Sequence, residues 1–129
     1  MRLLTIKVTD EGHFRVLLSN SDEIKEVLYA LLQLITLGKV TTYKTLAECL
    51  RLPPRYIGKI LKENSMPIVI PCHRVVRSDL SPGGYTINGR SSPDFKRKLL
   101  VLEGVCLSKN KVCSGNVIRT VDELLSHNT

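Results

Sequence analysis

The sequence predicts a mostly helical α+β domain that contains a helix-turn-helix and begins with a short β hairpin. Three observations predict this fold class. Two β-prone runs flank the turn-forming residues Asp10-Glu11-Gly12, apolar residues recur at helical spacing from Ile24 to Ile35, and two short helical segments meet at Pro53-Pro54. With 129 residues, of which 43% are hydrophobic, the chain is long enough to bury a core of its own.

The predicted hairpin pairs residues 3–8 with residues 14–18. We expect residues 1–20 to form a short N-terminal β segment and residues 21–106 to form the main domain. Residues 107–129 are expected to be a C-terminal tail, with a short helix around residues 121–125.

The first predicted helix is capped by Ser21 or Asp22 and closes at Gly38. Its apolar residues recur every three or four positions, which is typical of an amphipathic helix that faces a core. They are Ile24, Val27, Leu28, Leu31, Leu32 and Ile35.

A second, short helix is predicted from a cap at Thr41 or Thr42 through Leu50. Pro54 suits the first turn of a third helix, which extends from residue 55 to about residue 63. The third helix buries its apolar residues and leaves three basic ones outside, and this pairing of short helices predicts the helix-turn-helix. The basic residues are Arg55, Lys59 and Lys62.

Two further elements are predicted before the tail. The β-branched run Ile68-Val69-Ile70 is too short for a helix and predicts a buried strand that ends at Pro71. Ser92 and Pro93 are expected to open a last helix that closes at Gly104. The expected inward residues of that helix are Phe95, Leu99 and Leu102.

Composition limits the classes of function. The net charge is +7, and from Gly38 to Arg77 there are eight basic residues and two acidic ones, a balance that attracts a polyanion. A merely solvated surface is the alternative. No apolar run is long enough to span a membrane, and the N-terminus lacks the apolar region of a signal peptide. A cytoplasmic protein is therefore expected.

The four cysteines contain no CxxC pair, so a zinc ribbon is not expected. A cytoplasmic chain is expected to keep its cysteines mostly reduced. A disulfide between Cys106 and Cys113 is the less favoured alternative.

Cys72 is the candidate for covalent chemistry. It follows the predicted strand, is next to His73, and precedes Arg74 and Arg77. Positive charge and a neighbouring proton acceptor favour the thiolate, which is the nucleophilic form of cysteine. A buried structural cysteine beside a surface histidine is the alternative.

The residues around Cys72 carry a more specific signal. Pro71-Cys72-His73-Arg74-Val75 follows an Ile/Val run, Asn64 precedes the cysteine by eight residues, and Gly83-Gly84-Tyr85 follows it. This pattern resembles the O6-alkylguanine-DNA alkyltransferases, also called methylated-DNA–protein-cysteine methyltransferases, over about residues 21–104. The resemblance implies single-turnover repair of O6-alkylguanine in the minor groove of double-stranded DNA by a monomer. It also implies a winged-helix-like catalytic domain, here without the usual N-terminal domain, that uses no cofactor or metal.

The resemblance also implies roles for individual residues. Cys72 would accept the alkyl group, His73 would take the thiol proton through a water, Glu103 would orient His73, and the Tyr43 hydroxyl would reach N3 of the guanine. The implied DNA-binding residues are Arg55, which would fill the gap left by the extruded base, together with Tyr43, Thr42, Lys59, Lys62 and Arg74. The implied substrate pocket comprises Val75, Gly83, Tyr85, Thr86 and Lys96, and Asn64 would be the hinge to the third helix.

The chain departs from the resembled pattern after Tyr85. Relatives often continue with a small residue and two glycines, whereas this chain has Thr86-Ile87-Asn88-Gly89. Ile87 is expected to narrow the pocket unless it turns into the core.

Two other functions remain open at this point. A lesion-binding relative without transfer activity would lack the acceptor cysteine, and Cys72 is present. A helix-turn-helix regulator would need side chains that read base edges, and Pro54, Ile57 and Gly58 are poor readers.

Overall fold

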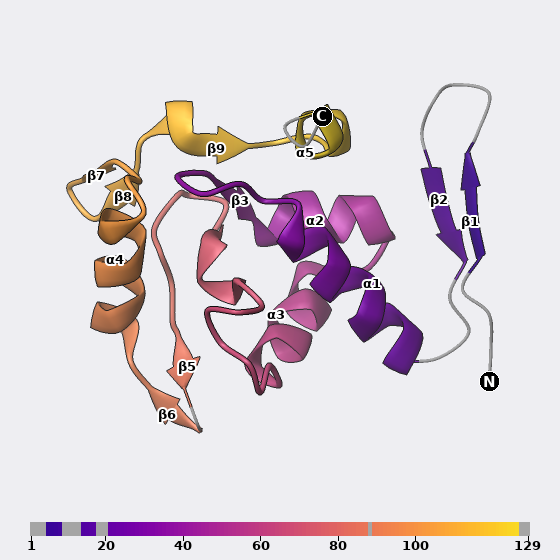
Figure 1. Cartoon of the computed structure of the whole chain (residues 1–129), viewed down its shortest axis with the longest axis horizontal. Coiled ribbons are helices and arrows are strands. Elements are labelled where there is room, and N and C mark those ends of the chain that lie inside the picture. The colour runs from indigo at the N-terminus through magenta and orange to yellow at the C-terminus, as the bar shows by residue number, and fades with distance from the viewer. Residues whose placement is uncertain (1–4, 9–13, 18–20, 88, 127–129) are drawn as a thin grey trace.

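The computed structural model describes residues 5–8, 14–17, 21–87 and 89–126 (Figure 1). It has the expected α+β class, with helices surrounding small sheets. The helices are α1 (Ser21–Gln33), α2 (Tyr43–Leu50), α3 (Pro54–Lys62), α4 (Pro93–Leu102), α5 (Val121–Ser126) and the 3-10 turns η1 (Cys72–Arg74) and η2 (Ser114–Asn116). The strands are β1 (Thr5–Val8), β2 (Phe14–Leu17), β3 (Val40–Thr42), β4 (Val75–Val76), β5 (Thr86–Ile87), β6 (Arg90–Ser91), β7 (Leu107–Ser108), β8 (Lys111–Val112) and β9 (Val117–Ile118).

The N-terminal hairpin is confirmed. Strands β1 and β2 pair antiparallel, with Thr5 opposite Leu17 and Val8 opposite Phe14. The predicted turn at residues 10–12 and the outer ends of both predicted runs lie outside the described residues.

Helix α1 is shorter than expected, because it ends at Gln33 and not near Gly38. The next two amides bond three residues back, Leu34 to the Leu31 carbonyl and Ile35 to the Leu32 carbonyl, so the chain leaves the helix through a tighter turn. The apolar stripe nevertheless stays inside as predicted, and Ile35 is only 1% exposed. Gly38 has φ +87°, and a Cβ there would lie 3.3 Å from the Glu103 carbonyl oxygen, so glycine permits this close approach.

A parallel three-stranded sheet of order β4-β3-β9 forms the centre of the domain, and the sequence did not predict it. Thr41 pairs with Val75 on one side and with Ile118 on the other. Strand β3 is entirely buried and leads directly into α2. Thr42 caps α2, as predicted, because its hydroxyl accepts a hydrogen bond from the Thr45 amide at 3.0 Å.

Helices α2 and α3 are joined by a short turn. Arg51 takes the left-handed conformation at φ 56°, Pro53 is extended, and Pro54 occupies the first turn of α3, where a missing amide costs nothing. Ile57, Ile60 and Leu61 are buried, so the apolar face of α3 is the one predicted.

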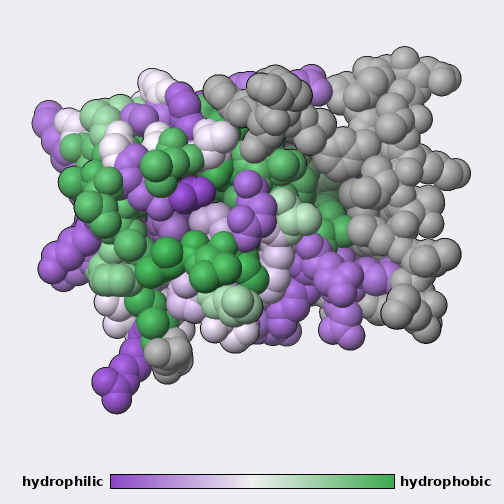
Figure 2. Space-filling view, viewed as in Figure 1, coloured by the Kyte–Doolittle hydropathy of each residue, from purple (hydrophilic) through white to green (hydrophobic). Residues whose placement is uncertain are grey.

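The predicted buried strand at Ile68–Ile70 is wrong. Residues 67–70 form a turn in which Ile68 has φ 77°, and Ile68 and Val69 are 49% and 63% exposed. Proline at both ends, Pro67 and Pro71, removes two backbone donors and leaves too few amides for a strand. Figure 2 shows hydrophobic and hydrophilic side chains side by side on the face of the domain that it presents.

The inward face of α4 also differs from the prediction. Lys96 and Leu100 are buried at 1% and 0% exposure, whereas Phe95 and Leu102 are 36% and 83% exposed. Leu99, the other residue predicted to face inward, is partly buried against the core, so the prediction is wrong for Phe95 and Leu102 and correct for Leu99. Among the described residues, no helix has the length and apolar character needed to cross a membrane.

The C-terminal segment packs into the domain. Strands β7 and β8 form a hairpin, β9 joins the central sheet, and the predicted short helix is confirmed as α5, with Leu124 fully buried. A disulfide joins Cys106 to Cys113 across the hairpin, and Cys49 and Cys72 are free. The alternative that the sequence disfavoured is therefore the one observed.

The disulfide leads to a first prediction. Replacing Cys106 and Cys113 together by alanine should lower the free energy of unfolding, because the disulfide restricts the unfolded chain. The loss should be only about 2 kcal/mol, because the loop that the bond closes is short. Urea unfolding with and without a reductant measures this loss. The reductant should lower the stability of the wild type and leave that of the double variant unchanged. Equal free energies of unfolding of the two proteins without reductant would contradict the prediction.

Candidate functional site

Cys72 lies at the start of η1 and is held by the turn before it. Pro71 has φ −80° and ψ 63°, and the Cys72 amide bonds to the Ile70 carbonyl at 2.7 Å, which together form an inverse γ-turn. Cys72 is buried, with 7% of the residue exposed. Asn64, after the end of α3, donates from Nδ2 to the Ile70 carbonyl at 2.9 Å and to the Cys72 sulfur at 3.2 Å. The end of α3 is thereby tied to the cysteine.

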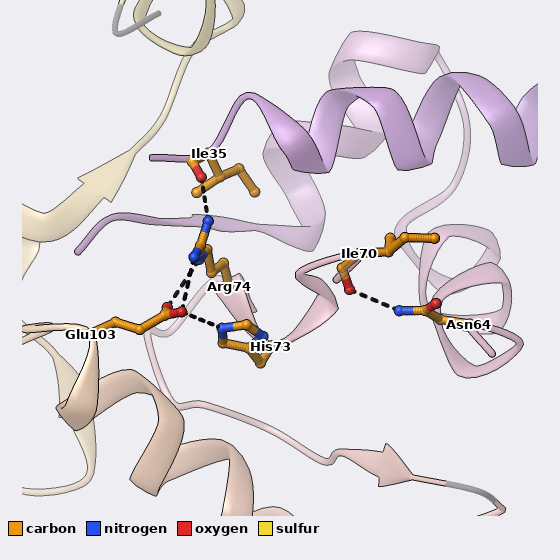
Figure 3. A network of polar contacts seen from close by, with 6 residues as sticks. All are labelled: Ile35, Asn64, Ile70, His73, Arg74 and Glu103. Atoms are coloured by element: carbon orange, nitrogen blue, oxygen red, sulfur yellow. Dashed lines mark hydrogen bonds and ion pairs between the residues drawn. The ribbon is translucent and has the colours of Figure 1, made fainter. Parts of the chain in front are cut away.

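His73, Arg74 and Glu103 form a polar network beside Cys72 in which His73 is fully buried and the other two are partly buried (Figure 3). His73 Nε2 lies 3.0 Å from Glu103 Oε2. Arg74 binds the same carboxylate through two hydrogen bonds, Nε to Oε1 at 3.0 Å and Nη2 to Oε2 at 2.9 Å, and its Nη1 donates to the Ile35 carbonyl at 2.7 Å. The sequence predicted the contact between His73 and Glu103 but not the part played by Arg74.

The protonation states of this network follow from burial and charge. Burial lowers the pKa of His73, and Glu103 opposes this effect without cancelling it, while the charges of Arg74 and Lys96 lower the pKa further. Burial alone would raise the pKa of Glu103, but the hydrogen bonds from Arg74 and His73 outweigh it, and the pKa lies below its usual value. The arrangement is therefore a neutral imidazole held by an ionised carboxylate.

A groove runs between α3 and the segment that contains β5 and β6, and Cys72 lines it. Arg55, Lys59 and Lys62 of α3 form one wall, and Tyr85 and Thr86 line the opposite side. The lining residues are Tyr43, Lys44, Pro54, Arg55, Gly58, Lys59, Leu61, Lys62, Cys72, Arg77, Ser78, Asp79, Gly84, Tyr85, Thr86 and Ser91. A basic groove that leads to a nearly buried sulfur suits a polyanion that places one small group on that sulfur.

Two tyrosines and a lysine enclose Cys72. Burial and the nearby Cys72 sulfur raise the pKa of Tyr43 and of Tyr85, so both phenols stay protonated at neutral pH. Lys96 is fully buried beneath the groove and donates from Nζ to the Val75 carbonyl at 2.7 Å. Its Nζ also lies 5.9 Å from the centre of the Tyr43 ring.

Lys96 leads to a second prediction. Burial lowers its pKa to about 8, against an ordinary value of 10.5. Between these two values the unfolded chain binds a proton that the folded chain has lost, so raising the pH favours the folded wild type. Relative to that of Lys96→Met, the free energy of unfolding of the wild type should rise by about 2 kcal/mol between pH 8 and pH 10, as measured by urea unfolding. A difference in stability that is the same at both pH values would contradict this pKa.

Five residues expected to bind DNA or to form the pocket do not line the groove, and one of them is the buried Lys96. Thr42 is 3% exposed and caps α2, and Arg74 is turned inward onto Glu103. Val75 is buried in β4, where its carbonyl accepts the bond from Lys96, and Gly83 lies against the side chain of Arg77.

For Ile87 the structure shows the alternative that the sequence left open. Ile87 packs against the main core and does not line the groove, so it does not narrow the pocket. Sequence reasoning in turn missed several lining residues, among them Arg77, Gly84 and Ser91. Arg77 carried a signal, because it is one of the basic residues that follow Cys72, and Gly84 carried one as part of the run Gly83-Gly84-Tyr85. Ser91 carried none beyond its place in a polar loop.

The part of the chain that builds the groove and the polar network is a DNA-binding domain. The family model described as the DNA-binding domain of 6-O-methylguanine DNA methyltransferase matches residues 23–105. A methylated-DNA–protein-cysteine methyltransferase of Pyrobaculum aerophilum is 43% identical over 107 residues, which cover 83% of this chain and 68% of that protein. The protein of the same name from Rattus norvegicus is 37% identical over 83 residues, 63% of this chain and 38% of that protein. The chain belongs to the 6-O-methylguanine DNA methyltransferase family.

Solved structures agree with this placement. The O6-methylguanine-DNA methyltransferase of Pyrococcus kodakaraensis superposes with a TM-score of 0.56 at 37% identity, covering 64% of this chain and 46% of that one. The OGT protein of Mycobacterium tuberculosis in complex with DNA gives a TM-score of 0.58 at 29% identity, covering 71% and 56%. Atl1 of S. pombe, with a TM-score of 0.59 at 24% identity and coverage of 73% and 89%, shares the fold.

Proposed function

We propose that the chain repairs O6-alkylguanine in double-stranded DNA by transferring the alkyl group irreversibly to Cys72. The observation that carries this proposal is the position of Cys72. Its sulfur lies at the base of a groove with one basic wall, next to a histidine that an ionised glutamate holds. Family membership and the neighbours solved with DNA support the same substrate.

The proposed chemistry is a displacement at the alkyl carbon. His73 accepts the Cys72 proton through a water, and Glu103 stabilises the imidazolium that results. The thiolate attacks the alkyl carbon, the bond from that carbon to O6 breaks, and its electron pair stays with the guanine, which takes up a proton. Tyr43, whose hydroxyl is protonated at neutral pH, is placed in the groove to supply that proton.

The base must leave the duplex to reach the sulfur of Cys72, because this residue is only 7% exposed. We propose that α2 and α3 act as a helix-turn-helix in the minor groove, that Arg55 fills the gap in the base stack, and that Lys59 and Lys62 bind phosphates. Tyr85 and Thr86 would form the wall of the base pocket, and Asn64 would link α3 to the sulfur. One copy of the chain would repair one lesion.

Incubation with a duplex that contains one O6-methylguanine tests this proposal. Intact-mass analysis should show one added CH2 per chain, and peptide mapping should place it on Cys72. Binding to the lesion without a gain in mass would indicate a lesion-binding protein. Binding without preference for the lesion would indicate a regulator.

A further inference from the structure

Arg74 occupies an unusual position between the C-terminal ends of two helices (Figure 3). Glu103 is the C-cap residue of α4, and the Ile35 carbonyl lies just past the end of α1. The C-terminal end of a helix carries a partial negative charge, and neither helix has a basic residue in its own last turn. Arg74 therefore brings the positive charge that both ends lack.

The carboxylate of Glu103 depends on this arginine. A negative side chain at the end of α4 is disfavoured by the helix, and burial disfavours it further. Two parallel hydrogen bonds from one guanidinium fix the plane of the carboxylate as well as its charge. Because Oε2 of that carboxylate also faces His73 Nε2, the orientation of the histidine follows from the position of Arg74.

Arg74 also limits the basicity of His73. The groups that act on the imidazole are the Glu103 carboxylate and the charges of Arg74 and Lys96, and the Tyr85 ring packs edge-on at 6.4 Å. A buried histidine paired with a lone carboxylate would hold its proton strongly and would not be free to accept one from a thiol. Burial is the largest cause of the lowered pKa of His73, and the charge of Arg74 adds to it by offsetting part of the effect of the carboxylate.

We propose that Arg74 is a positioning residue for alkyl transfer: it fixes Glu103 and keeps His73 neutral, so that His73 can accept the proton of Cys72. This inference rests on the proposed function. It replaces the expectation that Arg74 binds DNA, because the guanidinium is committed to Glu103 and Ile35.

The test is the pH profile of transfer from the free base O6-benzylguanine, which needs no DNA contact. In Arg74→Gln the rate at pH 7 should fall at least tenfold, and the acid limb should move to higher pH by about one unit, because His73 becomes more basic. Arg74→Lys keeps the positive charge, so the acid limb of its pH profile should lie at the same pH as in the wild type, even if its rate is lower. Arg97→Gln is the matched control, because Arg97 also pairs with a carboxylate, that of Asp94, but on the exposed side of α4; it should change neither rate nor limb.

A second variant separates positioning from folding. In a Glu103→Gln background, Arg74→Gln should lower the transfer rate much less than it does in the wild type, because the carboxylate that Arg74 positions is already absent. A rate loss in Arg74→Gln with an unmoved acid limb and no coupling to Glu103 would overturn the inference while leaving alkyl transfer intact. Absence of transfer in the wild type would instead overturn the proposed function.

Discussion

A Cys72→Ser protein is expected to transfer no alkyl group and still to bind duplex DNA. The hydroxyl of serine is a far weaker nucleophile than a thiolate at neutral pH, and His73 has no means to ionise it fully. The basic wall of the groove is formed by α3 and does not include the sulfur, so affinity for DNA should stay within about twofold of wild type. Intact-mass analysis and a duplex-binding titration measure the two properties on the same samples.

Cys49→Ser is the control for this prediction. Cys49 is the other free cysteine, and burial raises the pKa of its thiol to about 11, so it stays protonated. The Cys49 variant should be alkylated as fully as the wild type. Alkylation of the Cys72→Ser protein at Cys49 would show that the acceptor has been misassigned.

Arg55→Ala is expected to slow repair of duplex DNA by about 100-fold while leaving transfer from free O6-benzylguanine unchanged. Arg55 is exposed at the start of α3 and lines the groove, so it can enter a base stack without moving the core. Extruding a base costs a few kcal/mol, which the Arg55 side chain offsets by filling the gap in the stack. Without that side chain, most of this free energy should be added to the activation barrier for repair. Single-turnover rates on both substrates measure the effect.

Lys62→Ala separates this role from simple attraction. Lys62 lies on the same helix and in the same groove, and as a phosphate contact it should weaken binding and reduce its salt dependence. At saturating DNA the Lys62 variant should repair at nearly the wild-type rate, whereas the Arg55 variant should stay slow. Equal losses on duplex and free base in Arg55→Ala would rule out insertion into the stack.

Local chemistry accounts for what the sequence could predict. Pro54 at the start of α3, Thr42 at the start of α2 and the stripe of α1 each act within a few residues, and all three were predicted correctly. The pairing of His73 with Glu103 came from the resemblance to a family, because no local pattern brings these two residues together.

The wrong predictions have physical causes that cannot be inferred from a few neighbouring residues. The strands of the central sheet are two or three residues long, too short to show a period of two. Lys96 was expected to line the substrate pocket and Arg74 to bind DNA, yet the buried carbonyl of Val75 and the carboxylate of Glu103 give them partners inside the domain. A buried polar residue is predictable only when its partner is known.

The order of the central sheet has a consequence for how the chain folds as it is made. β3 is the middle strand, but its neighbours come later, and Thr41 and Ile118 lie 77 residues apart. Until residue 118 has left the ribosome, one edge of β3 remains open, while α1, α2 and α3 can already pack by contacts between nearby residues. Completion of the sheet should therefore be a late step, and a ribosome-stalled chain that ends before β9 should be cleaved by protease near β3.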